Sequence, residues 1–140
     1  MNVSNNFSKT IDLLHRAMGA SAAREAVIAN NIANADVPNY KRSMVNFESE
    51  LKRALDSERQ RPVMELDRTH PDHISNWQPR DYRDVEVRRV LDYVSTMNNN
   101  GNNVDPEYEF NLALENQLRY MLLANSVNFE FSQVNMVLRG

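Results

Sequence analysis

The sequence has no cysteine and little glycine or proline. Its 140 residues include 3 Gly and 5 Pro. Without Cys, a disulfide framework and thiolate metal sites are excluded. Because Gly and Pro are the strongest helix breakers, their scarcity favours long helices. The length fits one domain and hardly two.

The sequence also lacks a long apolar run and an excess of positive charge. The longest apolar run, Tyr120 to Ala124, is far shorter than the roughly 20 residues that span a bilayer, so we expect a chain that does not span a membrane. Lys and Arg total 16 against 19 Asp and Glu, giving a formal net charge of −3, which argues against nucleic acid as a partner. The polar residues 1–6 do not resemble a secretory signal peptide.

The N-terminal segment, from about Asn6 to Ala35, is predicted to form one long helix. Its apolar residues recur at spacings of three and four, as on one face of a helix. Such a helix would be roughly 45 Å long, more than a compact domain of this size usually needs. This N-helix seam consists of Phe7, Ile11, Leu14, Met18, Ile28 and Ile32, with the polar positions Ser21 and Glu25 in its middle.

A second long helix is predicted to begin at residues 104–107. Asp105 suits the N-cap, Pro106 the first helical position, and Glu107 the positive end of the helix dipole. The C-helix seam consists of Phe110, Ala113, Gln117, Tyr120, Ala124, Val127, Phe131, Val134 and Leu138. A second apolar face carries Leu114, Leu118 and Met121. Because 140 residues supply too little cover for such a helix, we expect neighbouring subunits to bury it.

The middle segment has weaker signals. Phe47, Leu51 and Leu55 predict a short helix over about Asn46 to Arg59. Residues 60–83 are polar and hold three prolines, which predicts an exposed and partly mobile loop. The valines at 85, 87 and 90 fit either a strand or a short helix, and residues 98–103 form a turn-rich linker. The predicted fold class is mainly α, with long helices at both ends and an irregular middle.

The end of the first predicted helix has a distinctive sequence. Pro38 biases Val37 toward an extended backbone, and Pro38-Asn39 fits the centre of a turn whose second residue has a positive φ. Asn tolerates that conformation better than most residues. The amides of Asn30, Asn31 and Asn34 could bond free carbonyls or a neighbouring chain, and the alternative is a frayed helix end with solvated amides.

This segment resembles the signature of the flagellar basal-body rod protein family, in which Ala-Asn-Asn-(Ile/Leu)-Ala-Asn-Ala precedes a Pro-Gly-Tyr turn. Val37 stands where Thr is common and Asn39 where Gly is usual. The short chain, residues 68–74 and the stretches 101–105 and 115–120 further resemble the short proximal rod proteins, of which the family has more than one type. The residues that carry the signature are Ala29, Asn30, Asn31, Ile32, Ala33, Asn34, Pro38, Asn39 and Tyr40.

The resemblance implies a structural subunit of the proximal rod. Segments 1–40 and 104–140 would pair as one discontinuous antiparallel coiled-coil domain on the inside of a tubular drive shaft that transmits torque and encloses the export channel, with 41–103 facing outward. The implied partners are copies of the chain, other rod proteins, the membrane ring and the export gate. The resemblance also implies export by the flagellar type III apparatus into the periplasmic rod without a cleaved signal peptide. No enzymatic activity, cofactor, metal or small-molecule substrate is implied.

Other interpretations of single motifs are weaker. His70-Pro71-Asp72-His73 holds possible metal ligands, but a turn is favoured because no fourth ligand is evident. Glu109 and Glu115 could be paired carboxylates for acid–base chemistry, yet we expect solvated helix charges.

Two other functions stay open at this point. The chain could be a soluble helical adaptor or export chaperone, which would form a finite complex, whereas a rod subunit makes contacts that continue along a lattice. An enzyme would require a pocket of convergent titratable groups, which the sequence does not suggest.

Overall fold

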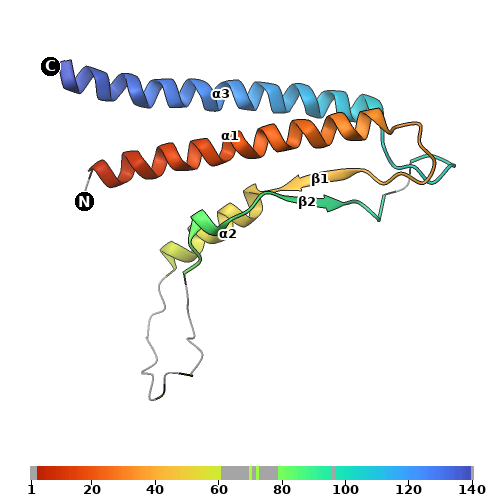
Figure 1. Cartoon of the computed structure of the whole chain (residues 1–140), viewed down its shortest axis with the longest axis horizontal. Coiled ribbons are helices and arrows are strands. Elements are labelled where there is room, and N and C mark those ends of the chain that lie inside the picture. The colour runs from red at the N-terminus through yellow and green to blue at the C-terminus, as the bar shows by residue number, and fades with distance from the viewer. Residues whose placement is uncertain (1–2, 61–69, 71, 73–78, 96, 140) are drawn as a thin grey trace. The chain divides into compact units, whose positions relative to one another are not determined.

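The computed structural model describes residues 3–60, 70, 72, 79–95 and 97–139. Its elements are α1 (Val3–Ala33), β1 (Ser43–Asn46), α2 (Glu48–Arg59), the 3₁₀ turn η1 (Tyr82–Asp84), β2 (Arg88–Leu91) and α3 (Pro106–Arg139), shown in Figure 1. The predicted fold class, mainly α with long terminal helices, is confirmed. The chain divides into two compact units, Met1–Val45 with Arg89–Gly140, and Asn46–Arg88.

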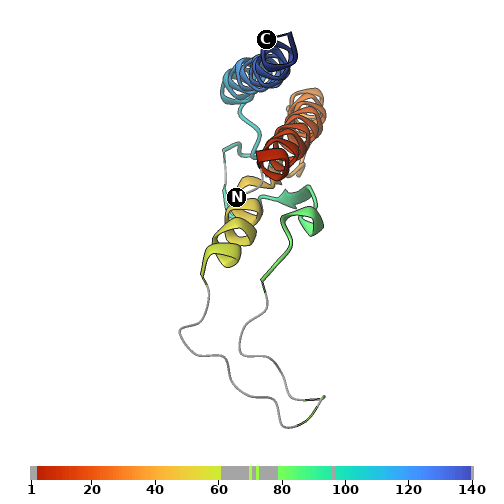
Figure 2. The same cartoon turned by 90° about the vertical axis from the view of Figure 1, so that its left-hand side faces the viewer.

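In the first unit, α1 and α3 lie side by side and run in opposite directions (Figures 1 and 2). Near the start of α1 and the end of α3, the rings of Phe7 and Phe131 meet edge to face with centroids 5.9 Å apart. In the middle of α1 the small residues Ala20 and Ser21 are buried, which allows close approach of another backbone, and Ile28 is buried about two turns later. The predicted pairing of the terminal helices is therefore confirmed.

Polar residues occupy part of the α3 face that packs against α1. Glu109 and Asn116 are buried there and bond groups of α1. Phe110 and Gln117, each one residue later, are exposed. The buried face of α3 thus begins one residue before the apolar periodicity suggests, because hydrogen bonds to α1 compensate the burial of two polar side chains.

β1 and β2 pair in a two-stranded sheet. Figure 1 shows the two strands running in opposite directions. Of the segment that the sequence left open between strand and helix, Val90 and Leu91 belong to β2, whereas Val85 and Val87 precede the strand. No strand was predicted over the residues of β1.

The second unit is built on α2, which confirms the short helix predicted over 46–59 and begins at Glu48. Phe47 and Ala54 are buried, as is Tyr82 of η1. The backbone N–H of Arg80 donates to Ser57 Oγ at 2.9 Å, which ties the segment before η1 to α2. Much of the predicted loop, at 61–69, 71 and 73–78, lies outside the described residues. Among the described helices, none carries an apolar stretch sufficient to cross a membrane.

Candidate functional site

The start of α3 is capped as the sequence predicts. Asp105 Oδ1 accepts hydrogen bonds from the backbone N–H groups of Glu107 at 3.0 Å and Tyr108 at 3.3 Å. Pro106 is the first helical residue, where its missing N–H leaves no unpaired donor. The N-cap at Asp105 is therefore confirmed, and it fixes where the chain enters α3.

The turn after α1 lies against the loop that precedes α3. Asn39 has φ 60°, which confirms the predicted positive φ, and its N–H donates to the Asn100 carbonyl at 3.0 Å. Gly101 has φ 79°, and a Cβ added there would lie 2.6 Å from Asn39 Oδ1. Glycine is required at 101 both for its backbone conformation and for the close approach of the two loops.

Asn102 caps the end of α1 from a distant part of the chain. Its side chain is fully buried, and its Nδ2 donates to the carbonyls of Asn34, Ala35 and Val37 at 3.0, 2.8 and 2.8 Å. Its Oδ1 accepts from the Val104 N–H at 2.7 Å. Because the chain beyond the helix end cannot continue the helical bonding pattern, this amide supplies an additional partner for these carbonyls from 65 to 68 residues away.

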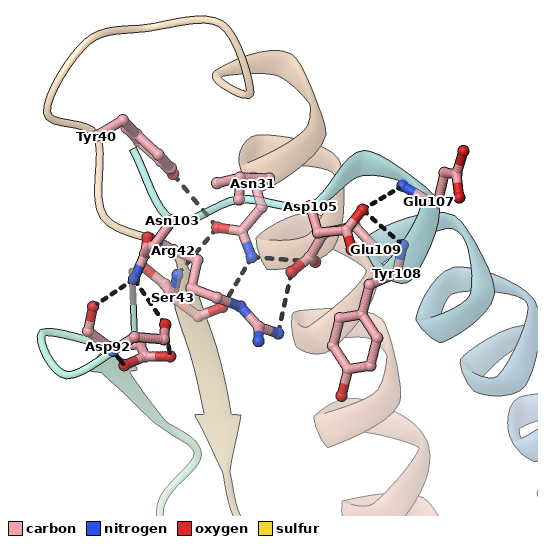
Figure 3. Close-up of polar contacts among 12 residues, drawn as sticks. Asn31, Tyr40, Arg42, Ser43, Asp92, Asn103, Asp105, Glu107, Tyr108 and Glu109 are labelled. Carbon is pink, nitrogen blue, oxygen red and sulfur yellow. Dashed lines mark hydrogen bonds and ion pairs between the residues drawn. The ribbon is translucent and has the colours of Figure 1, made fainter. Parts of the chain in front are cut away.

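Asn31 joins three elements at the same end of the helix pair (Figure 3). Its Nδ2 donates to the Ser43 carbonyl at 2.8 Å and to Glu109 Oε2 at 3.1 Å. Its Oδ1 accepts from the Ser43 N–H at 3.0 Å. One buried amide therefore holds α1, the start of β1 and α3 together.

The carboxylate of Glu109 is fully buried, which corrects the expectation of a solvated charge. The Arg42 guanidinium lies 3.0 Å from Glu109 Oε1 and stacks over the Tyr108 ring at 5.1 Å (Figure 3). Burial is tolerated because Arg42 and Asn31 compensate the charge, and removing one partner of such a pair costs about 3–5 kcal/mol. Glu115 is exposed as expected and pairs with Arg119 at 2.7 Å.

Asn103 and Asp92 fix the turn after β2 (Figure 3). Asn103 Nδ2 donates to the Asp92 carbonyl at 2.8 Å, while its Oδ1 accepts from the Arg42 N–H at 2.7 Å. The Asp92 carboxylate accepts from the hydroxyl of Ser95 at 2.6 Å and from the N–H groups of Ser95 and Val94. These bonds favour the charged form, the Ser95 hydroxyl most strongly, and hold the pKa of Asp92 below its ordinary value.

Asn116 is a second buried amide that joins α1 and α3, farther along the helix pair than Asn31. Its Nδ2 donates to the Ser21 carbonyl at 2.9 Å and to Glu25 Oε2 at 3.0 Å. A buried amide in a helix interface specifies which residues lie opposite each other, because sliding the helices would leave it without partners.

The predicted signature residues divide into buried and exposed groups. Asn31 is buried, and Ile32, Asn34 and Tyr40 are half-buried. Asn34 Nδ2 donates to the Asn30 carbonyl at 2.7 Å and the Tyr40 hydroxyl to Asn30 Oδ1 at 3.0 Å, so these amides have partners within the chain. Ala29, Asn30, Ala33, Pro38 and Asn39 are exposed.

The predicted seams are covered unequally. Ile28 is buried, and the half-buried members are Phe7, Ile11, Leu14, Met18, Ile32, Ala113, Ala124 and Val127. The exposed members are Phe110, Gln117, Tyr120, Phe131, Val134 and Leu138. The second face of Leu114, Leu118 and Met121 is exposed throughout.

Sequence reasoning missed several residues of this site, namely Arg42, Asn102, Asn103 and Glu109. Asn102 and Asn103 had been interpreted as part of a turn-rich linker and of a stretch that resembles the short proximal rod proteins, without a bonding role. In the other predicted cluster, His70 Nδ1 lies 3.5 Å from Asp72 Oδ2 with both side chains exposed, whereas His73 lies outside the described residues.

Comparisons with known proteins assign the chain to a family. A family model described as "Flagella basal body rod protein" matches residues 11–41, which include most of α1 and the turn after it. The flagellar basal body rod protein FlgB of Borreliella burgdorferi is 42% identical over 135 residues, covering 96% of this chain and 99% of that protein. The FlgB proteins of Bacillus subtilis and Escherichia coli are 34% and 31% identical, covering 96% and 89% of this chain and 96% and 88% of theirs.

The chain belongs to the FlgB family of flagellar basal body rod proteins. As a member of this family it is a structural component of the basal body rod. The resemblance found in residues 29–40 is thus confirmed by relatives that align along nearly the whole chain.

Proposed function

We propose that the chain is a rod-building protomer of the proximal rod, which polymerises with its own copies and with other rod proteins into a tubular drive shaft. The proposed role is mechanical, with no catalytic step. The subunit transmits torque through close helix packing and leaves a central channel open for exported chains. It is itself exported by the flagellar type III apparatus and meets the export gate and membrane ring at its final position.

The observation that carries this proposal is a row of exposed apolar side chains on α3. By helical periodicity these residues lie on the side of α3 opposite Glu109 and Asn116, which face α1. Exposed apolar patches of this extent mark interaction surfaces. We call this set the apolar stripe, and it consists of Phe110, Leu114, Leu118, Met121, Leu122, Phe129 and Met136.

The buried polar contacts at one end of the helix pair support the same proposal. Asn31, Glu109 and Arg42 fix α1, β1 and α3 to one another through buried polar contacts. A subunit that transmits torque requires its helices to hold a fixed relation under load. Buried polar contacts are suited to this because they have few alternative pairings.

The experiment that tests the proposal changes the apolar stripe alone. Leu118→Glu places a charge in the middle of the stripe, and a charge buried against an apolar neighbour without a partner is strongly unfavourable. Cells in which this variant replaces the native chain are expected to lose swimming in soft agar and to yield basal bodies without a complete rod by electron microscopy.

The matched control is Lys52→Glu, which adds the same side chain at an exposed polar position of α2, outside the stripe. It is expected to leave motility intact. Motile cells carrying Leu118→Glu would contradict the proposed packing, and a finite one-to-one complex with a single flagellar protein would favour an adaptor instead.

A further inference from the structure

The loop before α3 contains the sole Asn-Gly step of the chain, Asn100-Gly101. An asparagine followed by glycine is the sequence most open to attack of the next backbone nitrogen on the side-chain amide, because glycine has no side chain to obstruct the approach. Asn98 and Asn99 in the same loop are followed by asparagine instead. The loop therefore holds one reactive step and two neighbouring controls.

We propose that Asn100 is a deamidation site that the folded loop suppresses, so that the chain acquires aspartate or isoaspartate at position 100 chiefly while it is unfolded. In this reaction the deprotonated Gly101 nitrogen forms a bond to Asn100 Cγ. The Cγ–Nδ2 bond breaks, and the amide nitrogen leaves as ammonia with the proton. Water then opens either carbonyl–nitrogen bond of the five-membered imide, and no oxidant or reductant takes part.

In the folded loop both reacting groups take part in hydrogen bonds, and these must break before the ring can close. The Gly101 N–H, which must lose its proton, donates to the Asn98 carbonyl at 3.1 Å. Asn100 Oδ1 accepts from the Asn102 N–H at 3.0 Å, which pins the side chain toward residue 102. The attack therefore requires the loop to open first, and its rate is set by the open fraction.

Contacts from outside the loop keep that open fraction small. The Asn39 N–H donates to the Asn100 carbonyl at 3.0 Å, and Lys41 Nζ donates to the Gly101 carbonyl at 2.8 Å. Next to them, Asn102 bonds the carbonyls after α1. Because these partners lie about 60 residues earlier in the chain, protection exists only when both ends of the first unit have folded together.

The two products differ in their effect on the loop. Aspartate at 100 keeps an oxygen that can accept from the Asn102 N–H. In isoaspartate the backbone runs through Cβ and Cγ of residue 100, which adds one methylene, and the former main-chain carbonyl that Asn39 bonds becomes a free carboxylate. A chain that stays unfolded long enough would accumulate molecules whose loop no longer fits against the turn after α1.

The test follows the modification in the full chain across a urea series, with sucrose added at the low end to favour the folded state. Mass spectrometry of the peptide containing residues 98–103 separates asparagine, aspartate and isoaspartate, and circular dichroism gives the folded fraction of each sample. We expect the rate at Asn100 to fall at least about tenfold from high urea to the most folded condition, as for local protection generally. A rate independent of the folded fraction would overturn the proposal, as would modification at Asn98 or Asn99 equal to that at Asn100.

A variant at a residue far from Asn100 in sequence tests whether the loop contacts themselves, and not only the global fold, suppress deamidation. Lys41→Met removes the bond to the Gly101 carbonyl without altering the Asn-Gly step, so its rate in high urea should equal that of the native chain. Under folding conditions the deamidation rate of the variant should exceed that of the native chain several-fold. The control, Lys52→Met, changes an exposed lysine of α2.

Equal protection in the Lys41 and Lys52 variants would show that the loop contacts do not suppress the reaction. If the Lys41 variant does not fold, the urea series of the native chain decides alone. Both measurements compare the deamidation rate with the folded fraction measured in the same sample, so a failure here leaves the proposed function standing.

Discussion

Four buried asparagine side chains, Asn31, Asn102, Asn103 and Asn116, bond backbone groups of other segments in the first unit. An amide both donates and accepts, so a single side chain can satisfy a carbonyl and an N–H at once. Asn31 does this with both backbone groups of Ser43. Other residues are poor substitutes for these asparagines. The carboxylate of aspartate cannot donate a hydrogen bond, and alanine leaves the backbone groups unpaired.

The first prediction concerns Asn102→Asp. The change removes both donors to the carbonyls after α1 and places a carboxylate against carbonyl oxygens, so the free energy of unfolding should fall by about 1–3 kcal/mol or more. Urea unfolding followed by circular dichroism measures it. Asn99→Asp, at an exposed position of the same loop, is the control and should change stability by less than about 0.5 kcal/mol. Equal losses in the two variants would contradict the capping role of Asn102.

The second prediction concerns pH and Asp92. Its pKa is lower in the folded chain than in the unfolded chain, so its ionised form stabilises the fold above the unfolded pKa. That contribution is lost as pH falls below about 4 through the lowered folded pKa. Asp92→Asn should reduce stability at neutral pH, because an amide nitrogen cannot accept from the Ser95 hydroxyl, and the difference from the native chain should shrink on acidification. Parallel unfolding curves at each pH test this, and a constant difference would be the contrary result.

Local features of the site were predictable from sequence, whereas its long-range contacts were not. The cap at Asp105 and the positive φ of Asn39 depend on residues within one or two positions. Asn102 and Glu109 find partners 65 to 78 residues away, and no spacing rule connects such positions. Glu109 resembled any other charge in the first turn of a helix.

At the scale of elements, polar residues as well as apolar ones fix how α1 and α3 pair. Asn116 bonds the Ser21 carbonyl and Glu25 in the middle of the pair, and Glu109 bonds Asn31 toward one end. The apolar periodicity correctly predicted two long helices, but it placed the seam at the start of α3 on Phe110 and Gln117. From sequence a polar side chain is expected to be exposed unless its hydrogen-bond partner is known. Glu109 and Asn116 have partners on α1, which their own sequence neighbourhood does not reveal.

The third prediction concerns Asn116→Ala. This change leaves the Ser21 carbonyl without its donor in the helix interface, so stability should fall by about 1–3 kcal/mol. The neighbouring Gln117→Ala, at an exposed position, should change it by less than about 0.5 kcal/mol. Denaturant unfolding of both variants compares them, and a larger loss in the Gln117 variant would place the contact face of α3 on the other residue.

At the scale of the whole molecule, many large apolar side chains of α3 are exposed in the first unit. The apolar stripe lies on the side away from α1, and Val137 and Leu138 near its end are also exposed. A helix whose stability depends on packing is marginal when its partner is absent. The terminal helices are therefore expected to be incomplete in a dilute, unassembled chain.

The fourth prediction follows for the isolated chain. Its helical circular dichroism should rise with protein concentration, because association stabilises the folded form by mass action. Sedimentation on the same samples should show the increase together with larger species. Full helicity with a sharp, concentration-independent melting transition and a monomeric mass would show that the chain covers its own apolar surface.

The pairing of β1 with β2 brings the chain back beside the point from which it left the first unit. A change in the length of the segment between β1 and β2 therefore need not change the spacing of α1 and α3. Lengthening a flexible connection twofold costs only about 0.6 kcal/mol, so insertions between the strands should be tolerated with little loss. Evolution could vary the size of the segment between the strands, or an engineer could graft a reporter into it, while the helices keep their alignment.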